Sequence, residues 1–277
     1  MPWSVPVSPM PSLKDSKQAD DTMKRIAVKI GSNVLTRADG TLDITRMSAL
    51  ADQVADLHKR GIQIILVSSG AVASGRSEIK PSHTLDEVSS RQLYSAIGQA
   101  KLMGKYYTLF REHGITCGQV LTTKEGLDKS DHYQNQQNCM EVMLSEGVIP
   151  IVNENDTLSI TELMFTDNDE LSGLMAEMMR VDMLIILSNI DGIYNGNPSS
   201  PDSQVIRYIQ VSDNDDLAQY IQSSRSSLGR GGMLTKCDIA RRVAGKGIPV
   251  IIANGKSEDI LLRLLDHPDE TLCTRFN

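Results

Sequence analysis

Two lysines stand beside glycines at points where the chain could approach an anion closely. The first lies in Val28-Lys29-Ile30-Gly31-Ser32, at the end of a short β-branched run. A lysine in an apolar strand is costly to bury unless it ends at a site, although a lysine on an edge strand can also reach outward to solvent. Gly31 would let a backbone N–H approach an anion, and Ser32 adds a hydroxyl donor. This pattern predicts a phosphate contact.

The second lysine, Lys236, follows a glycine-rich segment. Three glycines occupy four positions in Gly229-Arg230-Gly231-Gly232, and a predicted helix starts at Met233. Glycines, a helix N-terminus and a lysine together would wrap a polyphosphate. A plain surface turn is the alternative, but it gives no reason for so many glycines.

Polar residues also follow two apolar runs. Asn153-Glu154-Asn155-Asp156 comes after residues 148–152. Amides beside carboxylates suit a zwitterion, with Asp156 paired to an ammonium group and Asn153 bonded to a carboxylate or carbonyl, although a turn rich in Asn and Asp is common. Ser68-Ser69-Gly70-Ala71 follows residues 62–67, where small residues allow a helix N-terminus to abut a ligand or simply to pack closely.

Phe165-Thr166-Asp167-Asn168-Asp169 precedes a predicted helix. An N-cap followed by acidic residues in the first turn explains this pattern structurally. A functional interpretation makes Asn168 a substrate contact and Asp169 the carboxylate that orients nearby lysines. The two interpretations are compatible.

These residues need a scaffold, and from Lys24 onward strands and helices alternate. We predict strands at 25–30, 62–67, 115–121, 148–152, 183–187, 249–252 and 272–274, and helices at 45–59, about 85–113, 135–146, 171–179 and 233–244. The long helix could break near Gly98 or Gly104. The alternation predicts an α/β fold with a mostly parallel sheet covered on both faces, and ligands then bind at the carboxyl ends of the strands.

Composition narrows the possible classes of protein. The chain has 277 residues, 40% hydrophobic and 23% charged, and a formal net charge of −7. It is long enough for one large domain or two small ones, and its acidic balance argues against a general nucleic-acid binder. No apolar run approaches the roughly 20 residues that span a bilayer, so no membrane partner is expected. The 4 cysteines are far apart and the 5 histidines form no H-x-x-x-H pair, so neither a disulfide framework nor a structural metal site is expected.

Residues 1–22 form a separate segment with four prolines and no periodic pattern, which we interpret as a disordered extension. It lacks the apolar region of a signal peptide and the arginines of a mitochondrial presequence. We therefore expect a cytoplasmic protein. The common nucleotide and hydrolase motifs are missing: G-x-x-x-x-G-K-[ST], G-x-G-x-x-G, G-x-S-x-G and the protein-kinase H-R-D and D-F-G set.

Taken together, the segments around Lys29, Ser69, Asn153 to Asp156, Asp167 to Asp169 and Gly231 to Lys236 resemble the amino-acid kinase family, and the Asn-Glu-Asn-Asp run followed by Asp-Asn-Asp resembles its glutamate 5-kinase branch. The resemblance covers nearly all of residues 24–277. It implies a three-layer αβα sandwich and phosphorylation of the γ-carboxylate of L-glutamate by ATP with Mg²⁺, the first step of proline synthesis. It also implies one kinase domain over residues 23–277, without the C-terminal PUA-type domain of many relatives.

The resemblance also implies residue roles. Lys29 and Lys236 would contact the transferring phosphoryl group, and Asp169 would organise them. The glutamate-binding residues would be Ser69, Gly70, Asn153, Asp156 and Asn168; the nucleotide-binding residues would be Lys29, Gly31, Ser32, Ser188, Asn189, Arg230, Gly231, Gly232, Met233, Leu234, Thr235 and Lys236. Arg230 stands where a small residue is usual, and Thr166 where a glycine is usual. Mg²⁺ would be carried by ATP, with no dedicated protein ligands.

Three alternatives stay open at this point. A sister kinase would phosphorylate aspartate, N-acetylglutamate or uridylate, whereas the run from Asn153 to Asp156 favours an unblocked amino acid. A non-catalytic amino-acid sensor would be expected to lack one or both lysines. The kinase half of a bifunctional enzyme is excluded for a chain of this length, although a separate glutamate-5-semialdehyde dehydrogenase is a plausible partner. From the resemblance alone we expect proline as a feedback inhibitor and a homo-oligomer.

Overall fold

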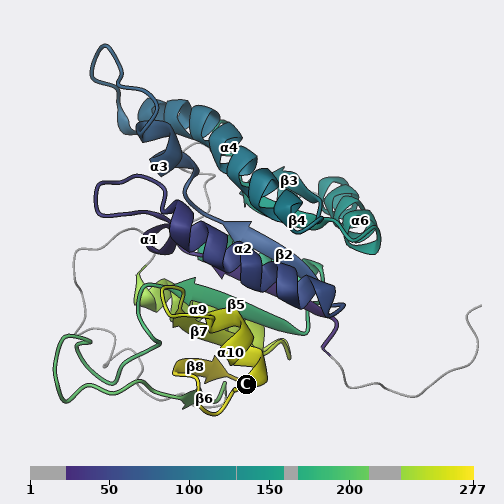
Figure 1. Cartoon of the computed structure of the whole chain (residues 1–277), viewed down its shortest axis with the longest axis vertical. Helices are drawn as coiled ribbons and strands as arrows, with labels where there is room; N and C mark the ends of the chain where they lie inside the picture. Colours follow the sequence, from purple (N-terminus) through teal and green to yellow (C-terminus); the bar gives the residue numbers. More distant parts are fainter. Residues whose placement is uncertain (1–22, 129, 159–167, 212–231) are drawn as a thin grey trace, which may run out of the picture.

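Figure 1 shows a computed structural model of the chain, which describes residues 23–128, 130–158, 168–211 and 232–277. The expectation for residues 1–22 lies outside the described residues, as do Thr166, Asp167, Arg230 and Gly231.

An eight-stranded sheet, ordered β3-β4-β2-β1-β5-β7-β8-β6, forms the centre of the described part. Its strands are β1 (Arg25–Ile30), β2 (Gln63–Ser68), β3 (Cys117–Thr122), β4 (Ile149–Glu154), β5 (Met183–Ser188), β6 (Tyr208–Ile209), β7 (Val250–Asn254) and β8 (Cys273–Phe276). β1 lies between β2 and β5 and is parallel to both. β7 and β8 are antiparallel, and the other pairings are parallel, as predicted.

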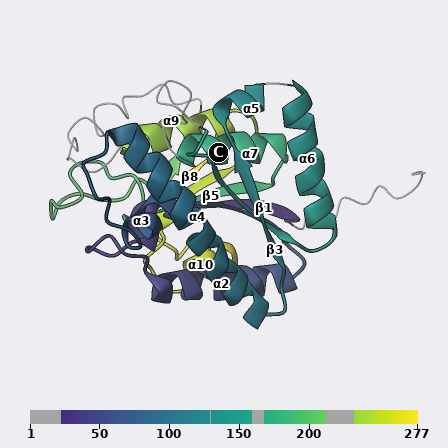
Figure 2. The same ribbon diagram turned by 90° about the horizontal axis from the view of Figure 1, so that it is seen from above.

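Helices cover both faces of the sheet (Figure 2). On one face lie α2 (Ile44–Lys59), α4 (Glu87–Glu112) and α10 (Ile260–Asp266), which share one buried cluster with α1 (Ser32–Leu35) and α3 (Ala71–Arg76). On the other face lie α6 (Ser130–Ser145), α7 (Asn168–Met178) and α9 (Met233–Ala244), with α5 (Lys124–Asp128) beside α6. The expected αβα sandwich is confirmed.

The period of two along β1 decides which helices its lysine meets. Ile26, Val28 and Ile30 belong to the cluster of α2, α4 and α10, and Ala27 belongs to the cluster of α6, α7 and α9. Because alternate residues of a strand point to opposite faces, Lys29 follows Ala27 toward α7 and α9. Its position late in β1 brings it to the carboxyl edge of the sheet.

The long helix α4 does not break at either glycine. It runs unbroken from Glu87 to Glu112, and Gly98 packs against α3 instead. A Cβ at Gly98 would lie 1.8 Å from the carbonyl oxygen of Ala71, and a Cβ at Gly75 would lie 1.9 Å from that of Tyr94. These two glycines therefore allow α3 and α4 to cross at backbone contact.

The predicted elements agree with the structure within a few residues, with two consequences for the site. β4 extends through Asn153 and Glu154, which therefore belong to the strand rather than follow it. α7 begins at Asn168, so Asn168 and Asp169 belong to its first turn. None of the helices described is long and apolar enough to cross a membrane.

Candidate active site

Lys29, Asp169 and Lys236 form a buried cluster of one carboxylate between two ammonium groups, here called the positive cluster. Lys29 Nζ lies 2.5 Å from Asp169 Oδ1, and Lys236 Nζ lies 2.8 Å from Asp169 Oδ2. The three residues are 4%, 0% and 8% exposed, in the order Lys29, Asp169, Lys236. Asp169 therefore contacts both lysines, and its predicted role of organising them remains a prediction.

The electrostatic state of Asp169 depends on these neighbours. Burial alone opposes ionisation, but Lys29 and then Lys236 outweigh it and hold the pKa of this carboxyl below its usual value. With Asp169 ionised, two positive charges face one negative charge. These three side chains together carry one net positive charge at low solvent exposure, where charges act strongly on an anion.

Three elements meet to build the positive cluster. Lys29 lies at the end of β1, Asp169 in the first turn of α7, and Lys236 in the first turn of α9. α7 packs on both β1 and α9. The negative side chain of Asp169 is also favourably placed at a helix N-terminus, so local structure and site chemistry agree.

The backbone N–H of Gly31 is already paired within the sheet. Its N–H donates to the carbonyl oxygen of Leu187 at 3.1 Å and is not left for a ligand. A Cβ at Gly31 would lie 3.1 Å from that oxygen and 3.7 Å from Lys29 Nζ. Gly31 thus allows the end of β1 to lie close to β5 and leaves space at the lysine, while the exposed Ser32 begins α1.

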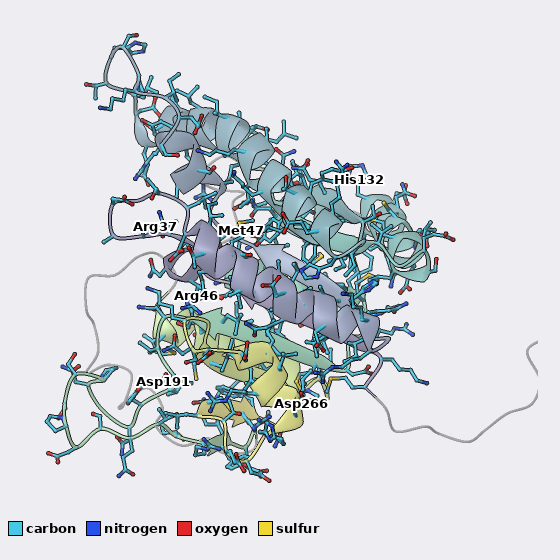
Figure 3. All side chains as sticks on the ribbon, in the orientation of Figure 1. Arg37, Arg46, Met47, His132, Asp191 and Asp266 are labelled. Atoms are coloured by element: carbon cyan, nitrogen blue, oxygen red, sulfur yellow. The ribbon has the colours of Figure 1, made fainter. Side chains whose placement is uncertain are left out.

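The other residues predicted for the nucleotide lie at the end of β5 and at the start of α9. Ser188 is buried at the end of β5, and Asn189 is exposed directly after it. Asp191, labelled in Figure 3, accepts hydrogen bonds from Tyr194 and Asn254 and ties this loop to the end of β7. Gly232 caps α9 without a side-chain hydrogen bond, and the first turn of α9 contains Met233, Leu234, Thr235 and Lys236.

An amide cluster connects α7 to β2 and β4. The Asn168 side-chain N–H groups donate to Ser68 O at 3.0 Å, Ser69 Oγ at 2.9 Å and Asn153 Oδ1 at 3.0 Å. Three of the predicted substrate-binding residues, Ser69, Asn153 and Asn168, are therefore in direct contact. The fourth, Gly70, caps α3 with a φ of 105°, a left-handed conformation that favours glycine.

The remaining predicted substrate residue, Asp156, belongs to a second charged cluster, here called the negative cluster. Arg91 of α4 contacts Asp156 Oδ1 at 2.7 Å and Glu154 Oε2 at 3.0 Å. Burial raises the pKa of the Asp156 carboxyl above its usual value, although Arg91 counteracts the effect. One guanidinium faces two carboxylates, which makes this cluster the electrostatic inverse of the first.

Arg91 also lines a cavity of about 390 Å³ between α3 and α4, together with Val72, Arg76, Glu87 and Ser90. Arg76 lies over the ring of Tyr94, 5.6 Å from its centroid. The Arg91 side chain therefore contacts the two buried carboxylates and also lines the cavity.

Comparisons with known proteins agree with this geometry. A sequence model of the amino acid kinase family matches residues 24–254. A glutamate 5-kinase of Bacteroides thetaiotaomicron is 68% identical over 252 residues, which cover 91% of this chain and 69% of that protein. A glutamate 5-kinase of Chlorobaculum tepidum is 47% identical, over 86% of this chain and 65% of that protein.

The chain belongs to the amino acid kinase family, in its glutamate 5-kinase group. It spans about two thirds of the length of these two relatives. Kinases of this family use ATP, so the chain is an ATP-dependent phosphotransferase. A solved isopentenyl phosphate kinase complex has the same fold, with a TM-score of 0.65 at 15% identity over 91% of this chain and 100% of that one.

The side chains present fit a nucleotide with its metal. The positive cluster offers two ammonium groups to phosphate oxygens, and the carboxylate of Asp169 is already held by both lysines. No group of three His, Cys, Asp or Glu side chains suited to a metal occurs among the described residues.

Sequence reasoning missed Arg91, Glu154 and Gln99. Gln99 of α4 accepts a hydrogen bond from Asn153 Nδ2 at 2.9 Å and is buried beside the amide cluster. Both α4 residues lie inside a long helix with no local motif, so only the fold reveals their contact with β4. Glu154 stands within the polar run that was singled out, but no separate feature distinguished it from Asn155.

Proposed function

We propose that this protein transfers the γ-phosphoryl group of ATP to the γ-carboxylate of L-glutamate, giving L-glutamyl 5-phosphate and ADP. The observation that carries the proposal is the buried positive cluster at the carboxyl edge of the sheet. Its positive charge offsets the repulsion between the carboxylate and the phosphate, which are both anions. The identity with glutamate 5-kinases supports glutamate as the acceptor.

The reaction needs no general base. The γ-carboxylate of glutamate has an unperturbed pKa of about 4.3, so it is already a nucleophile at neutral pH. The barrier arises from bringing this anion in line with an anionic phosphate, so catalysis consists of positioning and charge neutralisation. Lys29 and Lys236 supply the neutralising charge from opposite sides of Asp169.

Asp169 acts as the positioning residue of the positive cluster. Each of its carboxylate oxygens holds one ammonium group, which fixes both lysines before the substrates bind. Preorganised charge stabilises a transition state without a reorganisation cost at the moment of reaction. A carboxylate that held only one lysine would leave the other free to move.

Glutamate binds between the two clusters. Asp156 receives its ammonium group, and Ser69, Gly70, Asn153 and Asn168 contact its polar groups. Asn168 is covalently next to Asp169 and donates to Asn153, which precedes Glu154 of the negative cluster. The binding residues therefore connect the ammonium end of the substrate to the reacting end.

The nucleotide and its cation complete the site. Gly31, Ser32, Ser188, Asn189 and the segment from Arg230 to Lys236 bind ATP. Mg²⁺, when bound to the phosphates, adds further positive charge against the transferring group.

Five further expectations from the sequence belong to the proposal. Proline inhibits the enzyme by overlapping glutamate at Asp156 and Asn153, because it shares the α-amino and α-carboxylate groups. The protein forms a homo-oligomer and acts in the cytoplasm. A glutamate-5-semialdehyde dehydrogenase accepts the labile acyl phosphate. Residues 23–277 form one kinase domain.

Trapping the acyl phosphate with hydroxylamine tests the proposal directly. L-glutamate, L-aspartate and N-acetyl-L-glutamate are compared at equal concentration with ATP, with and without Mg²⁺. We expect hydroxamate from glutamate only, and only with the metal. Comparable yields from aspartate or N-acetylglutamate would identify a sister kinase, and ATP binding without any hydroxamate would favour a sensor.

A further inference from the structure

Arg91 has more hydrogen-bonding capacity than its two carboxylate partners use. Its contacts with Asp156 and Glu154 involve Nε and Nη2. A guanidinium carries five N–H donors in a rigid planar fork. No hydrogen bond from Nη1 to any described residue is found. Arg91 therefore presents a charged donor edge beyond the two carboxylates.

Asp156 likewise has one oxygen occupied. Arg91 contacts Oδ1, and within the described part of the chain no hydrogen bond or ion pair to Oδ2 is found. An ammonium group at Oδ2 would leave the contact with Arg91 intact. The second carboxylate, Glu154, keeps the guanidinium in place from the other side.

In an α-amino acid the ammonium group and the α-carboxylate are bonded to the same carbon atom. An acceptor whose ammonium group contacts Asp156 therefore carries its α-carboxylate close by. Arg91 is the cation of the negative cluster, and it contacts the same aspartate. Arg76 of α3 and Ser90 of α4 line the same cavity as Arg91, and α3 begins directly after Gly70. Glu87, an acidic residue of the cavity lining, lies one helix turn before Arg91.

We propose that Arg91 is a specificity-determining residue that binds the α-carboxylate of the amino-acid substrate while its contacts with Glu154 and Asp156 hold it in place. This inference rests on the proposed function. The negative cluster then recognises both charged groups of the α-amino acid: Asp156 binds the ammonium and Arg91 the carboxylate. A substrate with only one of these groups fits poorly.

The test compares glutamate with two analogues that each lack one group. 4-Aminobutyrate lacks the α-carboxylate, and glutarate lacks the ammonium group. Hydroxamate formation gives kcat/KM for each compound with the wild-type protein, Arg91→Met and Arg91→Lys. For an analogue that turns over too slowly, its Ki against glutamate replaces kcat/KM in the comparison.

We expect Arg91→Met to lower kcat/KM for glutamate by about 10- to 100-fold, the effect of one charge-assisted hydrogen-bonded pair. Most of the loss appears in KM, since the α-carboxylate is remote from the reacting group. The values for 4-aminobutyrate change little, so the preference for glutamate over 4-aminobutyrate falls by about the same factor. Arg91→Lys keeps part of that preference, because it retains the charge and loses the fork.

Arg111→Met is the matched control, because Arg111 is an exposed arginine in the last turn of the same helix. It should leave the preference unchanged. Equal losses for glutamate and 4-aminobutyrate in Arg91→Met would overturn the inference and assign Arg91 a purely structural role. The ratio of kcat/KM for two substrates does not depend on the fraction of the protein that is folded. If Arg91→Met does not fold, Arg91→Lys provides the test. A wild-type protein that phosphorylates no glutamate would refute the proposed function instead.

Discussion

The two charged clusters of the site are built with opposite stoichiometry. In the positive cluster one carboxylate, Asp169, lies between two lysines; in the negative cluster one arginine, Arg91, lies between two carboxylates. Both are largely buried, so solvent screens neither well. The contrast matches the proposed substrate, whose α-ammonium group would bind at the negative cluster while its γ-carboxylate reacts with another anion.

Asp169 and Asp156 respond differently to burial. Asp169 has two cations within 3 Å, and its pKa is lowered. Asp156 shares one cation with Glu154, and its pKa is raised. Burial opposes both charges, so the number of cationic partners decides the direction of the shift. The variants described next change the number of charged partners in a cluster or the packing that holds them in place.

The largest effect is expected from Asp169→Asn, which keeps the side-chain shape but leaves the two lysines facing each other. Breaking a buried ion pair by removal of one partner costs about 3–5 kcal/mol. We expect a loss of that size in the free energy of unfolding, measured by urea denaturation near neutral pH. Asp238→Asn, at an exposed position of α9, is the control and should change it by less than about 0.5 kcal/mol. A loss for Asp169→Asn no larger than the control would mean that the lysines do not depend on this carboxylate.

The next effect concerns turnover. Replacing Lys29 or Lys236 with Met removes one preorganised charge from the transition state, which typically costs about 10²–10³ in kcat. Hydroxamate formation at saturating glutamate and ATP measures the change. Lys105→Met, at an exposed position of α4, should retain the wild-type rate. Near-normal turnover in a folded Lys236→Met protein would disprove the role given to this residue.

A smaller effect is expected from Gly98→Ala, which disturbs the packing that positions α4 and Arg91. The added methyl group would lie 1.8 Å from the carbonyl oxygen of Ala71, so the helices must separate. Overpacking costs about 1–3 kcal/mol, and we expect a lower melting temperature together with a higher KM for glutamate. Gly104→Ala is the matched control in the same helix, since its Cβ meets nothing within 4 Å. Unchanged stability in Gly98→Ala would show that the crossing of α3 and α4 is not rigid.

The smallest effect is expected in the pH dependence of stability, which should have opposite signs for the two clusters. The lowered pKa of Asp169 stabilises the fold above the ordinary value of 3.8, and this contribution is lost as the pH falls through the folded-state pKa. The raised pKa of Asp156 means that its ionised form destabilises the fold, and this penalty is removed as the pH falls toward 3.8. Urea midpoints of Asp169→Asn and Asp156→Asn, each relative to wild type, should therefore drift in opposite directions on acidification. Parallel drifts would contradict the difference in partners.

Much of the site was predictable because its residues stand beside unusual local patterns. Lys29 and Lys236 are marked by neighbouring glycines, and Asp169 by its place at a helix start. The period of two along β1 then accounts for the meeting of Lys29 with α7. Strand and helix alternation likewise predicted the sheet and its layers, since each element carries its own hydrophobic pattern.

The missed features depend on contacts between distant parts of the chain. Arg91 and Gln99 sit in a long helix whose pattern reports only its own faces. Gly98 was interpreted as a break point, but it serves the crossing with α3, which no local pattern reveals. The hydrogen bond from the Gly31 N–H to Leu187 of the neighbouring strand likewise could not be read from the local pattern.

The most direct test of the account is the division of labour between the clusters. Initial rates of hydroxamate formation, at saturating ATP and varied glutamate, give kcat and KM for Lys236→Met and Asp156→Asn. We predict that Lys236→Met lowers kcat by about 10²–10³ with KM for glutamate changed far less. Asp156→Asn should instead raise that KM by about 10- to 100-fold with kcat largely kept. Both variants altering the same parameter to a similar extent would contradict the assignment of one cluster to reaction and the other to binding.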